Sequence, residues 1–136
     1  MMKVLVIDDD DNLRMMLRLI LESLGFAVLE ASNGIEGLAL FKSTGADAVL
    51  TDLIMPGKEG LETIVELGKI NPGLLIIAMT GGQQASASSN LRMARYLGAR
   101  AVLMKPFSGD ELAKALGSLL PRPAKEDEPG KQAKND

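Results

Sequence analysis

The chain is organised around one segment, Ala48-Val49-Leu50-Thr51-Asp52-Leu53-Ile54-Met55-Pro56-Gly57. Its apolar residues run into a single carboxylate, Asp52, and the Pro56-Gly57 turn then prevents the strand from continuing. This pattern predicts that Asp52 stands at the carboxyl end of a buried strand. If other strands bring carboxylates, a hydroxyl and a cation to the same edge, the cluster is a reaction site. If they do not, Asp52 only caps the next helix.

The composition fits one domain and excludes several kinds of chemistry. With 136 residues, 46% of them hydrophobic, the chain can bury a core of ordinary size. Fifteen basic and eighteen acidic side chains give a net charge of −3, so we expect no direct partner among nucleic acids or membranes. The chain has no cysteine or histidine, which excludes disulfides, thiol or imidazole catalysis and the usual zinc sites. Any metal must be bound by oxygen.

The first residues do not resemble a targeting segment. The apolar run of residues 4–7 is too short for a signal peptide or a membrane span, and charged residues follow immediately. A cytoplasmic location is therefore the expectation.

Five short apolar runs predict strands that are covered on both faces, as the strands of a parallel sheet are. They are residues 4–7, 26–29, 47–51, 74–79 and 101–104. Each is followed by a stretch in which apolar residues recur at helical spacing. Five alternations of strand and helix predict an α/β domain with a doubly wound, five-stranded parallel sheet and helices on both faces.

The helical stretches suggest which side chains face the sheet. The first has an apolar face made of Leu13, Met16, Leu17, Ile20, Leu21 and Leu24, with Arg14, Arg18 and Glu22 on the other side. The second, with Asn33 and Glu36 as its cap, is expected to bury Ile35, Leu38, Ala39 and Phe41. Ser108 and Glu111 form a capping box ahead of the last helix. Residues 80–90 show no clear period, so we expect a mobile loop that leads into a weak helix.

The apolar patterns stop near residue 120. Residues 121–136 contain no Leu, Ile, Val or aromatic side chain and are rich in Pro, Lys, Glu and Asp, so they cannot contribute to a core. We expect a folded domain over residues 1–120, followed by a disordered tail or the start of a linker over residues 121–136.

Several polar side chains follow the predicted strands directly. They are Asp8, Asp9, Asp52, Thr80 and Lys105. In open α/β sheets, ligands bind outside the carboxyl ends of the strands, so these groups are expected to meet at one edge. Three carboxylates placed together repel one another unless a cation lies among them, and oxygen ligands of this kind suit Mg²⁺, which completes its shell with water and phosphoryl oxygens. The cluster therefore predicts a magnesium-dependent phosphoryl-transfer site.

The same residues carry a family resemblance. Taken in order, the motifs Ile7-Asp8-Asp9, Asp52 to Gly57, Thr80-Gly81 and Lys105-Pro106-Phe107 resemble those of the receiver domains of response regulators in two-component signalling, the CheY-like superfamily. The resemblance covers Lys3 to about Leu120. It implies the flavodoxin-like strand order 2-1-3-4-5 and a cis bond between Lys105 and Pro106.

The resemblance also implies a role for each site residue. Asp52 would be the phosphoacceptor, and Asp8 and Asp9 would hold Mg²⁺ together with Asp52 and the backbone carbonyl of Ile54. Thr80 and Lys105 would contact the phosphoryl oxygens. The phosphoryl group would come from a histidine kinase or a phosphotransfer protein, and the output would be a contact with an unidentified downstream protein. Such a domain is a signalling switch that catalyses its own phosphorylation and dephosphorylation, and no conventional enzyme activity is expected.

One position departs from the family, and several alternatives stay open. Receivers commonly carry an aromatic residue where this chain has Val102, so the aromatic part of the usual switch is absent or is reassigned to Tyr96. The chain is expected to be a stand-alone receiver, and a fragment of a longer regulator or hybrid kinase is the alternative. A flavodoxin-type binder would need a glycine- and hydroxyl-rich phosphate loop at residues 8–11, where four aspartates stand. A phosphatase with an aspartyl nucleophile would need a second acid at Ile54.

Overall fold

Five parallel strands form one sheet in the order β2-β1-β3-β4-β5, as predicted. The computed structural model describes residues 1–53, 60–81 and 87–119. The strands are β1 (Lys3–Ile7), β2 (Ala27–Ala31), β3 (Ala48–Asp52), β4 (Leu75–Gly81) and β5 (Ala101–Lys105). The fold is therefore the doubly wound α/β class that the alternation of apolar runs indicates.

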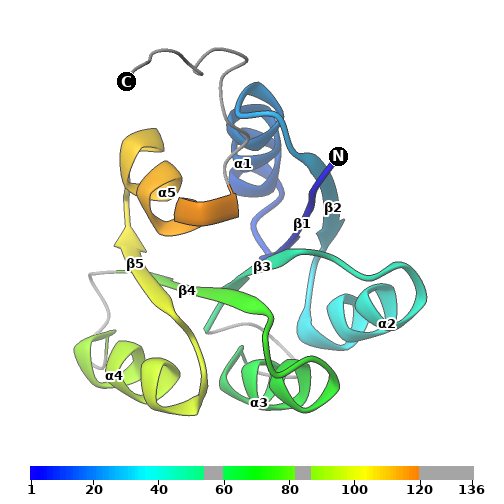
Figure 1. The fold of residues 1–136 in the computed structure, drawn as a ribbon. Coiled ribbons are helices and arrows are strands. Elements are labelled where there is room, and N and C mark those ends of the chain that lie inside the picture. The colour runs from blue at the N-terminus through cyan, green and yellow to red at the C-terminus, as the bar shows by residue number, and fades with distance from the viewer. Residues whose placement is uncertain (54–59, 82–86, 120–136) are drawn as a thin grey trace, which may run out of the picture.

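The helices cover both faces of the sheet. They are α1 (Asp11–Ser23), α2 (Gly34–Thr44), α3 (Gly60–Ile70), α4 (Ala87–Leu97) and α5 (Gly109–Leu116), and a short 3₁₀ turn, η1 (Gly117–Leu119), follows α5. Figure 1 shows α1 and α5 on one side of the sheet and α2, α3 and α4 on the other. No helix in the described part of the chain is long and apolar enough to cross a membrane.

Each face of the sheet carries its own core, because side chains alternate along a strand. On the α1 and α5 side, Val6, Leu50 and Met79 pack with Leu17 and Leu112. On the other side, the neighbouring strand residues Ile7, Val49 and Ala78 pack with Leu38 and Ile64. All five residues of β3 are buried, so the central strand is fixed from both sides up to its last residue, Asp52.

The buried face of α2 differs from the prediction. Ile35 keeps 65% of its surface exposed and Ala39 is also exposed, so the expectation that they are buried is wrong. Gly34 and Gly37 are buried instead. A Cβ on Gly37 would lie 2.4 Å from Cδ1 of Ile7, so the helix can pack this closely only because glycine stands there. The spacing of apolar residues did not predict that glycines would lie on the buried face of α2.

The apolar face of α1 is narrower than expected. Met16 is 49% exposed, and only Leu17 and Leu21 of this helix are fully buried. Arg14 and Arg18, which the pattern assigned to the solvent side, turn toward β2 and pair there with Glu30. They occupy the flank that a wider apolar face would have filled.

The predicted cap residues are largely confirmed. The side chain of Asn33 accepts a hydrogen bond from the N–H of Glu36, and Ser108 and Glu111 form a reciprocal capping box. The carboxylate of Glu36 accepts from the N–H and hydroxyl of Ser32, the residue before the cap.

The bond between Lys105 and Pro106 is cis, as the family resemblance implies. The mobile loop expected after Thr80 and the tail of residues 121–136 lie largely or wholly outside the described residues.

Candidate functional site

The register of the sheet brings two acidic residues to neighbouring positions at its carboxyl edge. β1 and β3 are adjacent and parallel, and Ile7 pairs with Thr51. The next residue along each strand is therefore an aspartate, Asp8 after β1 and Asp52 at the end of β3. Both are almost fully buried, at 0% and 6% exposed. A buried carboxylate pair at a strand edge is unfavourable unless other groups compensate its charge.

A third carboxylate, from Asp9, completes an acidic triad. One oxygen from each of Asp8, Asp9 and Asp52 lies within 4.8 Å of the others. Oxygens at this separation can bind a single hard cation, and an all-carboxylate set suits Mg²⁺. The described residues therefore fit the ion that the sequence predicts.

The side chain of Lys105 reaches into the same cluster from the end of β5. Its Nζ lies 2.7 Å from Oδ2 of Asp8 and 3.6 Å from Oδ2 of Asp52. A single ammonium thus contacts both buried carboxylates. It offers positive charge at the place where a phosphoryl group attached to Asp52 would stand.

The surroundings of Asp52 shift its pKa upward. Burial raises the pKa of Asp52 to about 6, from an ordinary value of 3.8. The ammonium of Lys105 opposes this shift, the charges of Asp8 and Asp9 add to it, and a hydrogen bond from the N–H of Leu53 opposes it. A carboxylate with a strongly perturbed pKa beside a cation, in a cluster of convergent polar groups, is typical of a reaction site.

Thr80 adds a buried hydroxyl to this edge of the sheet. The residue is fully buried near the end of β4, where it pairs in register with Met104, next to Lys105. Its Oγ1 is the one buried side-chain oxygen among the described residues that lacks a hydrogen bond. Buried hydroxyls are normally satisfied, so this one indicates that a bound group is expected to supply its partner.

Asp52 does not serve only as a helix cap, because two other carboxylates and a cation share its strand edge. It is the last residue of β3, and its Oδ1 accepts from the adjacent N–H of Leu53. The cap of α1 is Asp10, whose side chain accepts from the N–H groups of Asn12 and Leu13. The aspartate run thus serves two purposes, because Asp10 caps the helix whereas the two residues before it join the cluster.

Gly60 is a part of the site that the sequence analysis missed. A Cβ on this residue would lie 2.1 Å from the carbonyl oxygen of Asp52 and 2.5 Å from Cα of Leu53. Helix α3 therefore starts directly against the backbone of the predicted phosphoacceptor. The hydroxyl of Thr51 also binds this backbone, donating to the Asp52 carbonyl at 3.0 Å.

Of the predicted site residues, Asp8, Asp9, Asp52, Thr80 and Lys105 all lie at the carboxyl edge of the sheet. Ile54, whose carbonyl was predicted to bind the metal, lies outside the described residues. Tyr96, the suggested replacement for the aromatic switch residue, is 86% exposed on α4. Val102 is half-buried on β5.

Comparison with known proteins identifies the family. The sequence-family model described as the response regulator receiver domain matches residues 4–117. The chain belongs to this family. Receiver domains act in two-component phosphorelays and are typically signalling switches rather than conventional enzymes.

This receiver is similar in sequence to several characterised proteins. It is 34% identical to the chemotaxis protein CheY of Thermotoga maritima over 119 residues, which cover 86% of the chain and 96% of that protein. It is 29% identical to the sporulation initiation phosphotransferase F of Bacillus subtilis, with 88% and 94% covered. The transcriptional regulatory protein ResD of Bacillus subtilis is 32% identical, and the matched region spans only 48% of its length.

The fold is likewise shared with solved receivers. A response regulator receiver domain protein from Clostridium thermocellum superposes with a TM-score of 0.79 and is 34% identical, with 85% of this chain and 91% of that one covered. A CheY-like receiver from Methanospirillum hungatei has a TM-score of 0.78 at 29% identity. The strand order and acidic edge of this receiver therefore belong to a known architecture.

Proposed function

We propose that this receiver is a phosphoacceptor switch in which Asp52 takes a phosphoryl group from a histidine kinase or a phosphotransfer protein. The observation that carries the proposal is the environment of Asp52. Its buried carboxylate lies in a triad with Asp8 and Asp9, and Lys105 stands 3.6 Å away. Family membership supports the same role, because receivers act in phosphorelays.

The residues divide the chemistry among them. The ionised carboxylate of Asp52 attacks the phosphorus of a phosphohistidine, and the phosphorus–nitrogen bond breaks as the imidazole leaves with its electron pair. Lys105 contributes positive charge to the transferred oxygens. Mg²⁺, held by Asp8, Asp9, Asp52 and the Ile54 carbonyl, would supply further charge compensation at those oxygens.

Phosphorylation would then change the surface of the domain. An aspartyl phosphate is bulkier and more negative than a carboxylate, and it offers new acceptor oxygens. The buried hydroxyl of Thr80, which has no partner among the described residues, would donate to one of them. Movement of Thr80 would carry the adjoining segment with it, and a downstream protein would bind the altered face.

The remaining expectations belong to the same proposal. The receiver would occupy residues 1–120, with residues 121–136 as a tail or the start of a linker, and would act in the cytoplasm. Two relatives bear the names chemotaxis protein and sporulation initiation phosphotransferase. These names support either a protein contact or onward phosphotransfer as the output.

Intact-mass measurement after treatment with phosphoramidate, a small donor with a phosphorus–nitrogen bond, tests the proposal. The wild type should gain about 80 Da, the mass of one phosphoryl group, in the presence of Mg²⁺. It should gain nothing in EDTA. Asp52→Asn should not be modified under either condition, and a modified Asp52→Asn would contradict the assignment.

A further inference from the structure

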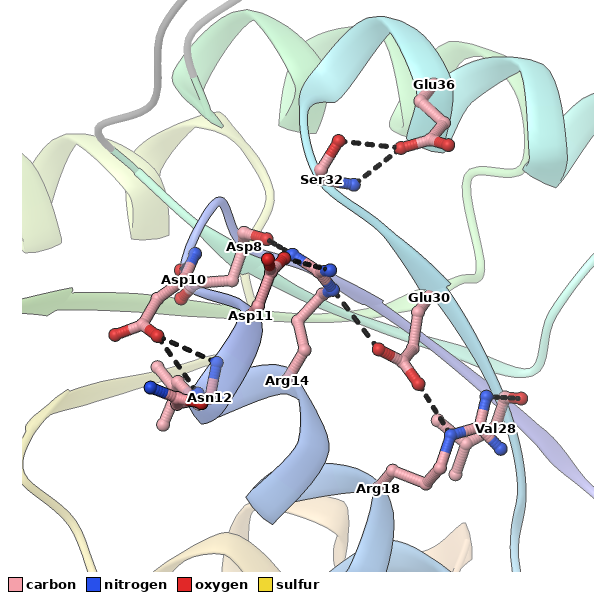
Figure 2. A network of polar contacts seen from close by, with 11 residues as sticks. Asp8, Asp10, Asp11, Asn12, Arg14, Arg18, Val28, Glu30, Ser32 and Glu36 are labelled. Atoms are coloured by element: carbon pink, nitrogen blue, oxygen red, sulfur yellow. Dashed lines mark hydrogen bonds and ion pairs between the residues drawn. The ribbon is translucent and has the colours of Figure 1, made fainter.

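A polar network connects α1 and β2 to the acidic loop, residues 8–10, which lies between β1 and α1 (Figure 2). At its centre, the side chain of Arg14 is only 14% exposed. Its Nη1 donates to the backbone carbonyl of Asp8 at 2.6 Å, its Nε donates to Oε1 of Glu30 at 3.1 Å, and its Nη2 donates to Oδ1 of Asp11. One guanidinium thus ties together the end of β1, the first turn of α1 and the middle of β2.

The contact with Asp8 completes a set of bonds that fixes this residue. Its N–H donates to the carbonyl of Ala31 at 3.1 Å. Its Oδ1 accepts from the N–H of Asp10 at 2.9 Å, and its Oδ2 accepts from Lys105 at 2.7 Å. With Arg14 on the carbonyl, both the side chain and the backbone of Asp8 are held.

Asp9 depends on the same contact through the backbone. The carbonyl that Arg14 binds belongs to the peptide unit that joins Asp8 to Asp9, and a peptide unit is planar. Fixing this oxygen therefore fixes the plane from which Asp9 departs. The Asp9 side chain is exposed, and no hydrogen bond to its carboxylate is present within the described ranges. Its direction toward the triad is thus set by the backbone.

Glu30 holds Arg14 in this orientation. Its Oε1 faces Arg14, whereas its Oε2 accepts from Nε of Arg18 at 2.6 Å. The bond from Arg18, followed by that from Arg14, keeps the pKa of Glu30 below its usual value, so this carboxylate is ionised at neutral pH. Arg18 also binds the carbonyl of Val28 and the carboxylate of Glu22. In the described part of the chain, Arg18 makes no contact with the acidic loop.

We propose that Arg14 is a positioning residue for the metal ligands Asp8 and Asp9, and that Glu30 keeps it in place. The inference rests on the proposed function, because it takes Mg²⁺ as the ligand of the triad. The planar fork of a guanidinium directs three donors at three fixed acceptors, which the point charge of a lysine cannot do. Groups that orient metal ligands are worth roughly 10- to 100-fold in metal affinity.

The test measures Mg²⁺ affinity by calorimetry on the full chain, together with thermal unfolding in EDTA. Arg14→Gln should weaken Mg²⁺ binding about tenfold or more. Arg14→Lys should not restore the affinity, because charge without the fork does not hold the peptide. Arg18→Gln is the matched control, since Arg18 is the other arginine that pairs with Glu30. It should lower the melting temperature comparably and leave the Mg²⁺ affinity close to that of the wild type.

The other outcomes distinguish a purely structural role of Arg14 from a role in positioning the metal ligands. If Arg14→Gln fails to fold, Glu30→Gln replaces it and should weaken Mg²⁺ binding severalfold in a folded protein. Wild-type affinity in the folded Arg14 variant, or in Glu30→Gln where that replaces it, overturns the inference. So does an equal loss in the Arg14 and Arg18 variants. Failure of the wild type to bind Mg²⁺ would instead overturn the metal site itself, and the positioning role with it.

Discussion

The Nζ of Lys105 lies 2.7 Å from Oδ2 of Asp8, and the Asp8 side chain is fully buried. Without a metal, this ammonium is the positive charge that contacts the carboxylates of the triad in the described part of the chain. It stabilises the metal-free domain and also contacts a carboxylate that Mg²⁺ would bind. Lys105 and the metal are therefore expected to compete in the resting protein, although both would assist phosphoryl transfer.

Replacing Lys105 with methionine tests this competition. In EDTA, Lys105→Met should lower the free energy of unfolding by about 2 kcal/mol, less than the roughly 3–5 kcal/mol seen when a fully buried pair is broken. The reduction reflects the 23% of the Lys105 side chain that remains exposed. Mg²⁺ should bind the variant more tightly than the wild type, because a competing cation has been removed.

The control is Lys114→Met, which removes an exposed lysine from α5. It should change neither the stability nor the Mg²⁺ affinity appreciably. Weaker Mg²⁺ binding by Lys105→Met, measured by calorimetry, would show that the ammonium supports the metal site instead of competing for it.

The raised pKa of Asp52 predicts a pH dependence of stability. Between pH 3.8 and about 6 the native state binds a proton that the unfolded chain has lost, so the free energy of unfolding should fall as the pH rises through this window. A shift of about two units corresponds to about 3 kcal/mol. Urea unfolding in EDTA at several pH values measures it. Asp52→Asn should lack this part of the decline, and parallel curves for the two proteins would refute the shift.

Gly60 should be essential to the geometry of Asp52. Gly60→Ala would place a methyl group 2.1 Å from the Asp52 carbonyl, so the backbone must move, and overpacking of this kind costs about 1–3 kcal/mol. Phosphorylation of Asp52 should slow as well. Gly68 of the same helix has nothing within 4 Å of its would-be Cβ, so Gly68→Ala should stabilise the protein by about 0.5–1 kcal/mol. Similar effects of the two substitutions on unfolding would contradict this close contact.

These residues also show how far sequence reasoning reaches. The parallel sheet and the meeting of Asp8, Asp52 and Lys105 follow from apolar runs and from polar residues at strand ends, because parallel topology gathers those ends at one edge. The strand order was implied by the family resemblance alone. The cap at Asn33 depends on local spacing and was predicted correctly. Such features need no knowledge of how the helices pack.

Features that depend on close packing could not be read in the same way. The roles of Gly37 and Gly60 depend on how near a helix comes to a strand, and the sequence shows only that a small residue is present. Arg14 turns toward β2 because it pairs with Glu30, which is sixteen residues away in the sequence. The pairing of β1 with β2 places Glu30 beside α1. Helical spacing alone assigns an arginine to solvent.

Two buried threonines on adjacent strands should respond oppositely to valine. Thr51 donates to the Asp52 carbonyl, so Thr51→Val should cost about 1 kcal/mol. Thr80 has no partner in the described structure, so Thr80→Val should stabilise the unphosphorylated protein by about 1 kcal/mol. Beryllofluoride, a phosphoryl mimic, should then stabilise Thr80→Val less than the wild type. Destabilisation of Thr80→Val without the mimic would mean that its hydroxyl is already satisfied.

The identity of the phosphorylated residue tests the central claim most directly. After phosphorylation with Mg²⁺ present, borohydride reduces an aspartyl phosphate to homoserine, and peptide mass spectrometry then locates the change. We predict homoserine at position 52 in the wild type, only when both the donor and Mg²⁺ have been present, and no homoserine in Asp52→Asn. Homoserine at Asp8 or Asp9, or phosphorylation that leaves position 52 unchanged, would contradict the account.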